Sequence, residues 1–261
     1  MARAPSVLTV AGSDSGGGAG IQADLKTFAA HGVHGLSAIA ALTAQNTRGV
    51  QAVHVPPVAF LKTQLDSLFG DFDVRAVKIG MLANAKVVDA VADALETYQP
   101  KHVVLDPVMV SSSGHTLLET RAIRRLVERL LPLATVITPN IDEAALLLDH
   151  TIGNDDEAEG ALVELLALGA NAVLLKGGHL RGKTVIDRLD TGKALYEFEH
   201  PRLKVSGHGT GCTLSSAIAA NLALKKSLPD ACQAAGDYVF DALKAAYQPG
   251  KSGLSVLRHI A

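Results

Sequence analysis

The sequence of 261 residues has no tryptophan and few aromatic residues of any kind, with Phe, Tyr and Trp together making up 4%. It has only two cysteines, Cys212 and Cys232, which show no CxxC spacing. This argues against a disulfide framework and against a cysteine-based metal site. The net charge of −2 leaves only a slight surplus of acidic residues. Bulk electrostatics therefore provides no attraction to nucleic acid or to an anionic membrane.

Long apolar runs are also missing. No stretch approaches the ~20 residues of a membrane-spanning helix, and the first apolar run meets glycines too soon for a signal peptide. Hydrophobic residues nevertheless make up 48% of the chain and charged residues 19%, which is typical of a protein that buries a sizeable core. Repeats and long linkers are absent from the sequence. We therefore expect a cytoplasmic protein with a single domain over 1–261.

Short apolar runs alternate with longer helical patterns along the chain. Strands are predicted at 6–10, 37–42, 74–79, 102–105, 135–137 and 172–175. Helices are predicted at 21–31, 57–69, 83–97, 119–131, 155–168, 210–225 and 228–247. This rhythm predicts an α/β fold with a doubly wound, mostly parallel central sheet and helices on both faces. Two further runs, 184–187 and 194–198, flank Thr191-Gly192-Lys193 and predict a hairpin at the sheet edge.

Polar or glycine-rich residues follow each of six apolar runs. These segments are Gly12-Ser13-Asp14, Thr43-Ala44-Gln45-Asn46, Gly80-Met81, Asp106-Pro107-Val108, Thr138-Pro139-Asn140 and Lys176-Gly177-Gly178-His179. Ligands of open α/β sheets bind beyond the carboxyl ends of the strands. We therefore expect the six segments to converge on one ligand-binding rim.

The segment Gly209-Thr210-Gly211-Cys212 precedes a strong helix pattern. Glycines at the start of a helix let the backbone approach a ligand, and the unpaired N–H groups favour an anion such as a transferring phosphate. The alternative is an ordinary helix start with glycines for the turn. Cys212 favours the catalytic interpretation, because a thiol in the first turn of a helix can have a pKa below its usual ~8.5.

The N-terminal loop, residues 12–20, also opens a helix. It lacks the lysine of a P-loop and the GxGxxG spacing of a dinucleotide site, which argues against both. Two interpretations stay open for it: a flexible turn, or a loop that closes over a small substrate.

Asp106 and Glu143 are candidate Mg²⁺ ligands, since magnesium is held by one or two carboxylates, water and phosphates. Glu143 also forms a capping-box pattern with Asn140. Both roles are compatible if the Glu143 carboxylate reaches the metal through water. Lys176 could meet a nucleotide phosphate, and His179 and His208 have weak claims to a role.

Taken together, the Gly-Thr-Gly-Cys segment, residues 11–24, Lys78-Ile79-Gly80-Met81-Leu82 and the rim motifs resemble the hydroxymethylpyrimidine/phosphomethylpyrimidine kinases of thiamin synthesis. The resemblance is distributed from residue 6 to about residue 245. It implies a ribokinase-like three-layer α/β/α fold, ATP and Mg²⁺ as cofactors, a homodimer, and two successive phosphorylations of 4-amino-5-hydroxymethyl-2-methylpyrimidine.

The resemblance also implies residue roles. Gln45 would read the aminopyrimidine, since a carboxamide offers donors and an acceptor together. Cys212 stands where most ribokinase-like enzymes have an aspartate base. The remaining implied residues are Met81, Asp24 and Gly12 at the substrate, Gly209, Thr210 and Gly211 in the anion hole, Asp106, Thr138, Asn140 and Lys176 at the nucleotide, and Glu143 at Mg²⁺.

Three alternatives remain. A pyridoxal or pyridoxine kinase of the same superfamily also phosphorylates a hydroxymethyl group on a flat ring, and a dual activity is compatible with the motifs. Gln45 and the Ile79 before Gly80-Met81 favour the pyrimidine. A non-catalytic metabolite sensor would have no need of an anion hole. A dehydrogenase is remote because the dinucleotide fingerprint is missing.

Overall fold

The computed structural model describes residues 4–110, 114, 117–205 and 207–260, and its main sheet has nine strands. They are β1 (Ser6–Asp14), β2 (His34–Asn46), β3 (Gly49–His54), β4 (Val74–Ile79), β5 (His102–Leu105), β6 (Val136–Ile137), β7 (Val173–Leu175), β8 (Thr184–Asp190) and β9 (Leu195–Pro201). Their order is β3-β2-β1-β4-β5-β6-β7-β8-β9. The six strands from β2 to β7 pair in parallel, whereas β3, β8 and β9 are antiparallel.

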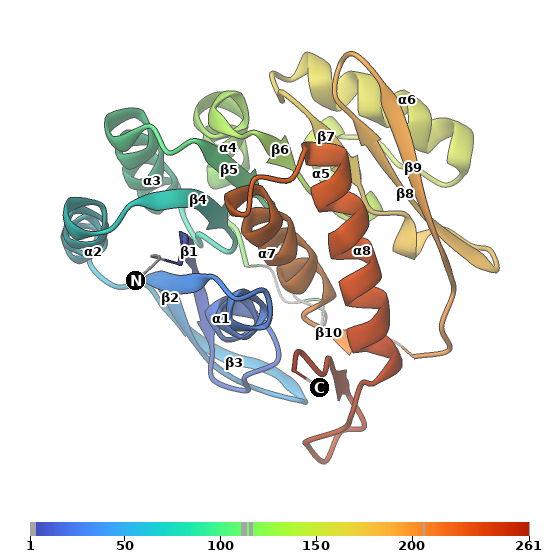
Figure 1. Ribbon diagram of the computed structural model, residues 1–261, viewed down its shortest axis with the longest axis horizontal. Helices are drawn as coiled ribbons and strands as arrows, with labels where there is room; N and C mark the ends of the chain where they lie inside the picture. Colours follow the sequence, from blue (N-terminus) through green and yellow to red (C-terminus); the bar gives the residue numbers. More distant parts are fainter. Residues whose placement is uncertain (1–3, 111–113, 115–116, 206, 261) are drawn as a thin grey trace.

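Helices cover both faces of this sheet (Figure 1). On one face lie α1 (Gly20–Ala30), α7 (Thr210–Ala223) and α8 (Leu228–Lys244). On the other lie α2 (Val58–Asp71), α3 (Ala85–Tyr98), α4 (Thr120–Arg129), α5 (Ile141–Leu148) and α6 (Asp155–Ala167). The predicted three-layer, doubly wound fold is therefore confirmed.

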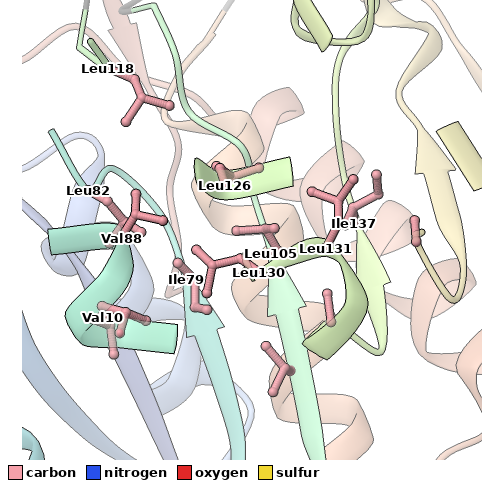
Figure 2. Packing of buried hydrophobic residues seen from close by; sticks show 14 of the residues in the cluster. Val10, Ile79, Leu82, Val88, Leu105, Leu118, Leu126, Leu130, Leu131 and Ile137 are labelled. Atoms are coloured by element: carbon pink, nitrogen blue, oxygen red, sulfur yellow. The ribbon is translucent and has the colours of Figure 1, made fainter. Parts of the chain in front are cut away.

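Neighbouring residues of the central strands are buried in opposite layers. Val104 packs with α7 and α8, while the adjacent Leu105 packs with the helices of the other face. Val136 and Ile137 are buried in opposite layers in the same way. Figure 2 shows Leu105 and Ile137 in the layer between the sheet and the helices α2 to α6. Because side chains alternate across a strand and both faces are covered, these strands read as continuous apolar runs.

The chain reverses direction across the sheet at β1. This strand pairs in parallel with β2 on one side and with β4 on the other. A reversal of this kind opens a crevice at the carboxyl ends of the strands, between the connections that leave in opposite directions. Doubly wound proteins bind ligands in this crevice. The loops that follow β1 and β4 therefore border the predicted site.

The hairpin predicted at the sheet edge is confirmed as β8 and β9. The structure adds elements that the apolar pattern did not reveal: β3, α5, and a short parallel pair formed by β10 (Gly207–His208) and β11 (Ser255–Val256). It also extends β2 to Asn46. The end of β2 and most of β3 are exposed or half-buried, so periodicity gave no signal there.

Candidate active site

The loop after β1 and the start of α7 are in direct contact. Gly209 is the N-cap of α7 and has a φ of +88°. A Cβ at this position would overlap the carbonyl oxygen of Gly18. Only glycine fits, both because of the positive φ and because of the close backbone approach. The two glycine-rich segments of the sequence thus meet, although they are about 190 residues apart.

The N-terminus of α7 has the properties of an anion site. The helix runs for 14 residues and is buried from Thr213 to Ala223, and its N-cap Gly209 provides no side-chain cap. The N–H groups of the first turn, including those of Thr210 and Gly211, lack intrahelical acceptors by the geometry of any helix start. With the positive end of the helix dipole they can bind a negatively charged group.

A charged cluster lies next to this helix start. A Cβ on Gly211 would be 3.1 Å from the Lys176 ammonium nitrogen. Lys176 Nζ donates to Asp106 Oδ1 at 3.0 Å and lies 3.5 Å from Glu143 Oε2. Three of the predicted nucleotide and metal residues are therefore brought together beside the predicted anion hole.

Burial and neighbouring charges set the protonation of this cluster. Burial raises the pKa of Glu143 to about 7, with Lys176 opposing the shift and Asp106 adding to it. Burial alone would lower the pKa of Lys176, but the attraction of Asp106 and Glu143 raises it well above its ordinary value. Lys176 is consequently a permanent cation, whereas Glu143 changes charge near neutral pH.

The other two predicted nucleotide residues, Thr138 and Asn140, have different positions next to this cluster. Thr138 is fully buried, and its hydroxyl donates to Asp106 Oδ1 at 3.4 Å. Its side chain thus lies behind Asp106 and has no exposed surface for a nucleotide. Asn140 caps α5, and its capping box with Glu143 is present, each residue accepting from the other's backbone N–H at 2.8 Å.

Asp24 lies elsewhere than the resemblance implied. Its side chain has no exposed surface, and both carboxylate oxygens accept from Lys78 Nζ at 3.0 Å. The hydroxyls of Thr9 and Ser216 donate to it at 2.6 and 2.7 Å. This arrangement corrects the expectation of a pocket residue: Asp24 is saturated by protein donors and joins β1, α1, β4 and α7 beneath the site.

Cys212 lies in the first turn of α7, as expected, but the prediction of a lowered pKa is wrong. Burial raises the pKa of the thiol to about 11, because Asp24 and Asp106 together with desolvation outweigh Lys78 and a backbone hydrogen bond from Gly20. The helix start alone does not ionise a thiol that two carboxylates surround. Cys212 is therefore a neutral thiol at neutral pH.

The remaining predicted substrate residues lie at the carboxyl ends of β1, β2 and β4. Met81 is buried, and its sulfur would be 3.0 Å from a Cβ on Gly12, so these two predictions are adjacent. Gln45 is half-buried, and its backbone N–H and carbonyl both bond to the hydroxyl of Ser15. The ends of β1, β2 and β4 thus converge as the rim argument predicted.

Sequence reasoning underrated His208. Its Nε2 is 3.1 Å from the Gln45 amide nitrogen and 3.3 Å from Asp14 Oδ2. Asp14 in turn accepts from the backbone N–H groups of Gly16, Gly18 and Ala19 at 2.7 to 3.0 Å. The position of His208 directly before the glycine segment was the signal that could have drawn attention to it.

Comparison with known proteins agrees with this geometry. A family described as phosphomethylpyrimidine kinase matches residues 14–256. A hydroxymethylpyrimidine/phosphomethylpyrimidine kinase from Rhizobium meliloti is 49% identical over 241 residues, which cover 92% of this chain and 90% of the relative.

Two solved structures are also similar. A phosphomethylpyrimidine kinase from Clostridium difficile 630 is 43% identical with a TM-score of 0.82, covering 91% of this chain and 99% of that one. A pyridoxal kinase from Bacillus subtilis, solved as an ADP complex, is 34% identical with a TM-score of 0.92, covering 98% and 97%. Among the described residues, no helix is both long and apolar enough to span a membrane.

Proposed function

Because the chain belongs to the phosphomethylpyrimidine kinase family and is therefore an ATP-using phosphotransferase, we propose that it phosphorylates 4-amino-5-hydroxymethyl-2-methylpyrimidine. The first transfer goes from ATP to the hydroxymethyl oxygen. The second goes to the monophosphate and gives the diphosphate used in thiamin synthesis.

One observation carries this proposal for the chain's own residues. The residue predicted to read the aminopyrimidine and the predicted anion hole adjoin each other, since Gln45 lies 3.1 Å from His208, the residue before Gly209. A substrate whose ring meets Gln45 would have its hydroxymethyl group close to the first turn of α7. Positioning of this kind, with charge stabilisation, is most of what phosphoryl transfer needs.

The residues support a nucleotide on the far side of the same helix start. Lys176 supplies a fixed positive charge beside Gly211. A cation there favours the β- and γ-phosphates, and the N–H groups of Thr210 and Gly211 favour the transferring group as it gains charge. Asp106, only 1% exposed, holds the ammonium in place.

Mg²⁺ fits the donor set of this cluster. Glu143 and Asp106 supply carboxylate oxygens, which are the ligands magnesium prefers, and one or two carboxylates with water and phosphates suffice. The described residues contain no group of three His, Cys, Asp or Glu side chains that could hold a metal by themselves, so water and the nucleotide phosphates would supply the remaining ligands. When bound, the ion neutralises charge on the phosphates.

Cys212 suits an enzyme that acts on two acceptors of different charge. Asp24 and Asp106 already place two carboxylates near the thiol. A third carboxylate at this position would repel the anionic monophosphate, whereas a neutral thiol would not. In the first transfer the hydroxymethyl proton then passes late to an oxygen of the transferred phosphoryl group, as a loose transition state permits.

The Cys212→Asp variant tests this argument. We expect the second phosphorylation to lose more activity than the first, measured as kcat/KM on the alcohol and on its monophosphate. Equal activity in both steps would contradict the charge argument. Full activity of Cys212→Ala in both steps would remove the thiol from the mechanism.

Pyridoxal is the second candidate substrate, and the similarity to the Bacillus subtilis pyridoxal kinase favours it. The pyrimidine is preferred because the phosphomethylpyrimidine kinase family covers most of the chain. Parallel assays of ADP formation with the two alcohols decide between them. Faster turnover of pyridoxal would reverse the assignment, and no ADP with either alcohol would favour a sensor.

The wider organisation remains part of the proposal. We expect one domain over 1–261, a cytoplasmic location and a homodimer. The edge strand β3 supports pairing of two copies, since Val53 on β3 and Leu42 on β2 are exposed apolar residues beside an open sheet edge. Light scattering after size exclusion would give a mass near 54 kDa, about twice 27.1 kDa, for the dimer.

A further inference from the structure

The carboxamide of Gln45 lies between two protein side chains. Its Nε2 is 3.1 Å from His208 Nε2, and its Oε1 is 3.3 Å from Thr43 Oγ1. A half-turn of the amide exchanges these two atoms with almost no change of shape. Whether His208 and Thr43 each donate or accept a proton decides which orientation of the Gln45 amide can form both hydrogen bonds.

The first constraint comes from Asp14. Burial alone would raise the pKa of this carboxyl, but hydrogen bonds from His208, Ala19 and Gly16 outweigh it, so the pKa is lowered. The carboxylate is ionised at neutral pH and can only accept. His208 Nε2, 3.3 Å from Asp14 Oδ2, must therefore carry a proton. A protonated Nε2 cannot accept a bond from the Gln45 NH₂ group.

The second constraint comes from Thr43. Its hydroxyl has one proton, which it donates to the backbone carbonyl of Ser13 at 2.9 Å. Because a carbonyl can only accept, this proton stays in the bond to Ser13 and cannot be donated to Gln45. Towards Gln45 the Thr43 oxygen is then an acceptor, and its partner should be an amide N–H rather than the amide oxygen.

Both constraints are met by one orientation. We propose that His208 is a positioning residue that fixes the Gln45 carboxamide with Oε1 towards His208 and Nε2 towards Thr43. His208 Nε2–H then donates to the amide oxygen, and the amide nitrogen donates to Thr43 Oγ1. Each bond has one proton, and no two donors face each other.

This orientation has a consequence for specificity, and it rests on the proposed function. The fixed amide keeps one N–H and one oxygen lone pair for a ligand. An amino group beside a ring nitrogen offers the matching donor and acceptor. A 4-oxo pyrimidine with a protonated ring nitrogen offers them in the reverse order. A fixed amide accepts only one of these patterns, whereas an amide free to turn accepts both.

The ring nitrogens of His208 provide the direct test, which needs no substrate. The wild-type protein is labelled with ¹⁵N at histidine, and His208→Gln identifies the resonance. At pH 7 we expect Nε2 to have the chemical shift of a protonated nitrogen, with its proton visible as a coupled signal. An unprotonated Nε2 would overturn the inference.

Specificity provides the second test. The kcat/KM ratio between the 4-amino alcohol and its 4-oxo analogue is measured for the wild type, for His208→Phe, and for His150→Phe as a matched control on the exposed surface. We expect the wild type to prefer the amino substrate by on the order of 100-fold or more. His208→Phe should reduce this ratio at least about 10-fold, as expected for loss of one orienting hydrogen bond, and the control should keep it.

A purely structural role for His208 would lower both kcat/KM values together and leave their ratio unchanged, which would overturn the inference. If the wild type turns over neither pyrimidine, the proposed function fails instead. The tautomer of His208 still decides the inference in that case.

Discussion

Two Asp–Lys pairs flank the start of α7, and they differ in access to solvent. Asp24 and Lys78 have no exposed side-chain surface. The side chains of Asp106 and Lys176 are 2% and 12% exposed, and Glu143 lies beside them as a second acid. The hydroxyls of Thr9 and Ser216 also donate to the Asp24 carboxylate. The Asp24–Lys78 pair is therefore closed, with no exposed polar atom left to bind a ligand.

We propose that these similar charges serve different purposes at the start of one helix. Ser216 is one turn after Cys212 on α7, so its bond to Asp24 ties the Asp24–Lys78 pair to the helix that carries the proposed anion hole. Lys176 faces Gly211 from the strand-end side. We propose that the Asp24–Lys78 pair is a framework and that the Asp106–Lys176 pair meets the nucleotide. The two pairs should therefore respond differently to mutation.

The largest effect is expected from Lys78→Met. Removal of the ammonium leaves the Asp24 carboxylate buried without a countercharge, which typically costs about 3–5 kcal/mol. Urea denaturation measures the loss in the free energy of unfolding. The double variant Lys78→Met/Asp24→Asn is the control, and it should recover part of the stability. If the double variant is as unstable as the single one, the buried charge is not the cause.

Lys176→Met should affect catalysis more than stability. Glu143 can take up a proton when the ammonium is lost, since its pKa is already about 7, so we expect a smaller stability loss than for Lys78→Met. The kcat/KM for ATP should fall about 100-fold, as for loss of one charge-stabilising donor. An unchanged kcat/KM for ATP, with stability lost as in Lys78→Met, would make the second pair a framework as well.

Glu143→Gln should change the pH dependence in two opposite ways. The folded pKa of about 7 lies above the ordinary 4.5, so this group's contribution to stability is present below pH 4.5 and is lost as the pH rises to 7. The variant should remove this loss, measured as Tm against pH. If the carboxylate holds Mg²⁺, activity should instead rise through pH 7.

In the same variant the rise of activity with pH near pH 7 should disappear. The Mg²⁺ concentration for half-maximal activity should increase about 10-fold. An unaltered magnesium requirement would exclude Glu143 from the metal site.

The smallest effect concerns Cys212. Its pKa of about 11 lies above the ordinary 9.0, so stability should fall as the pH rises from 9 to 11. Alkylation by iodoacetamide in a Cys232→Ser background should increase with a midpoint near 11, and Asp24→Asn should lower this midpoint. A wild-type midpoint below 8.5 would restore the picture of a thiol activated by the helix start.

The layers of the fold could be predicted because the strands are buried on both faces and therefore appear as apolar runs. β3 could not, since its residues are exposed or half-buried. The predicted proximity of the segments that follow the strands is confirmed for Gly12 with Met81 and for Lys176 with Asp106. The ends of neighbouring parallel strands share one edge of the sheet.

Partners within the site were much harder to predict. Asp24 and Lys78 are 54 residues apart and Asp14 and His208 are 194 apart, and no spacing rule connects them. The pKa of Cys212 was mispredicted for the same reason: its direction depends first on burial of the thiol and then on the nearby Asp24 and Asp106, all of which only the folded chain provides.

The most direct test of the whole account is a ³¹P NMR time course with the aminopyrimidine alcohol, excess ATP and Mg²⁺. The account predicts that a monophosphate signal rises first and is then replaced by the two signals of a diphosphate, with two ADP formed per alcohol. A reaction that stops at the monophosphate after one ADP, or gives no phosphorylated pyrimidine, would contradict it.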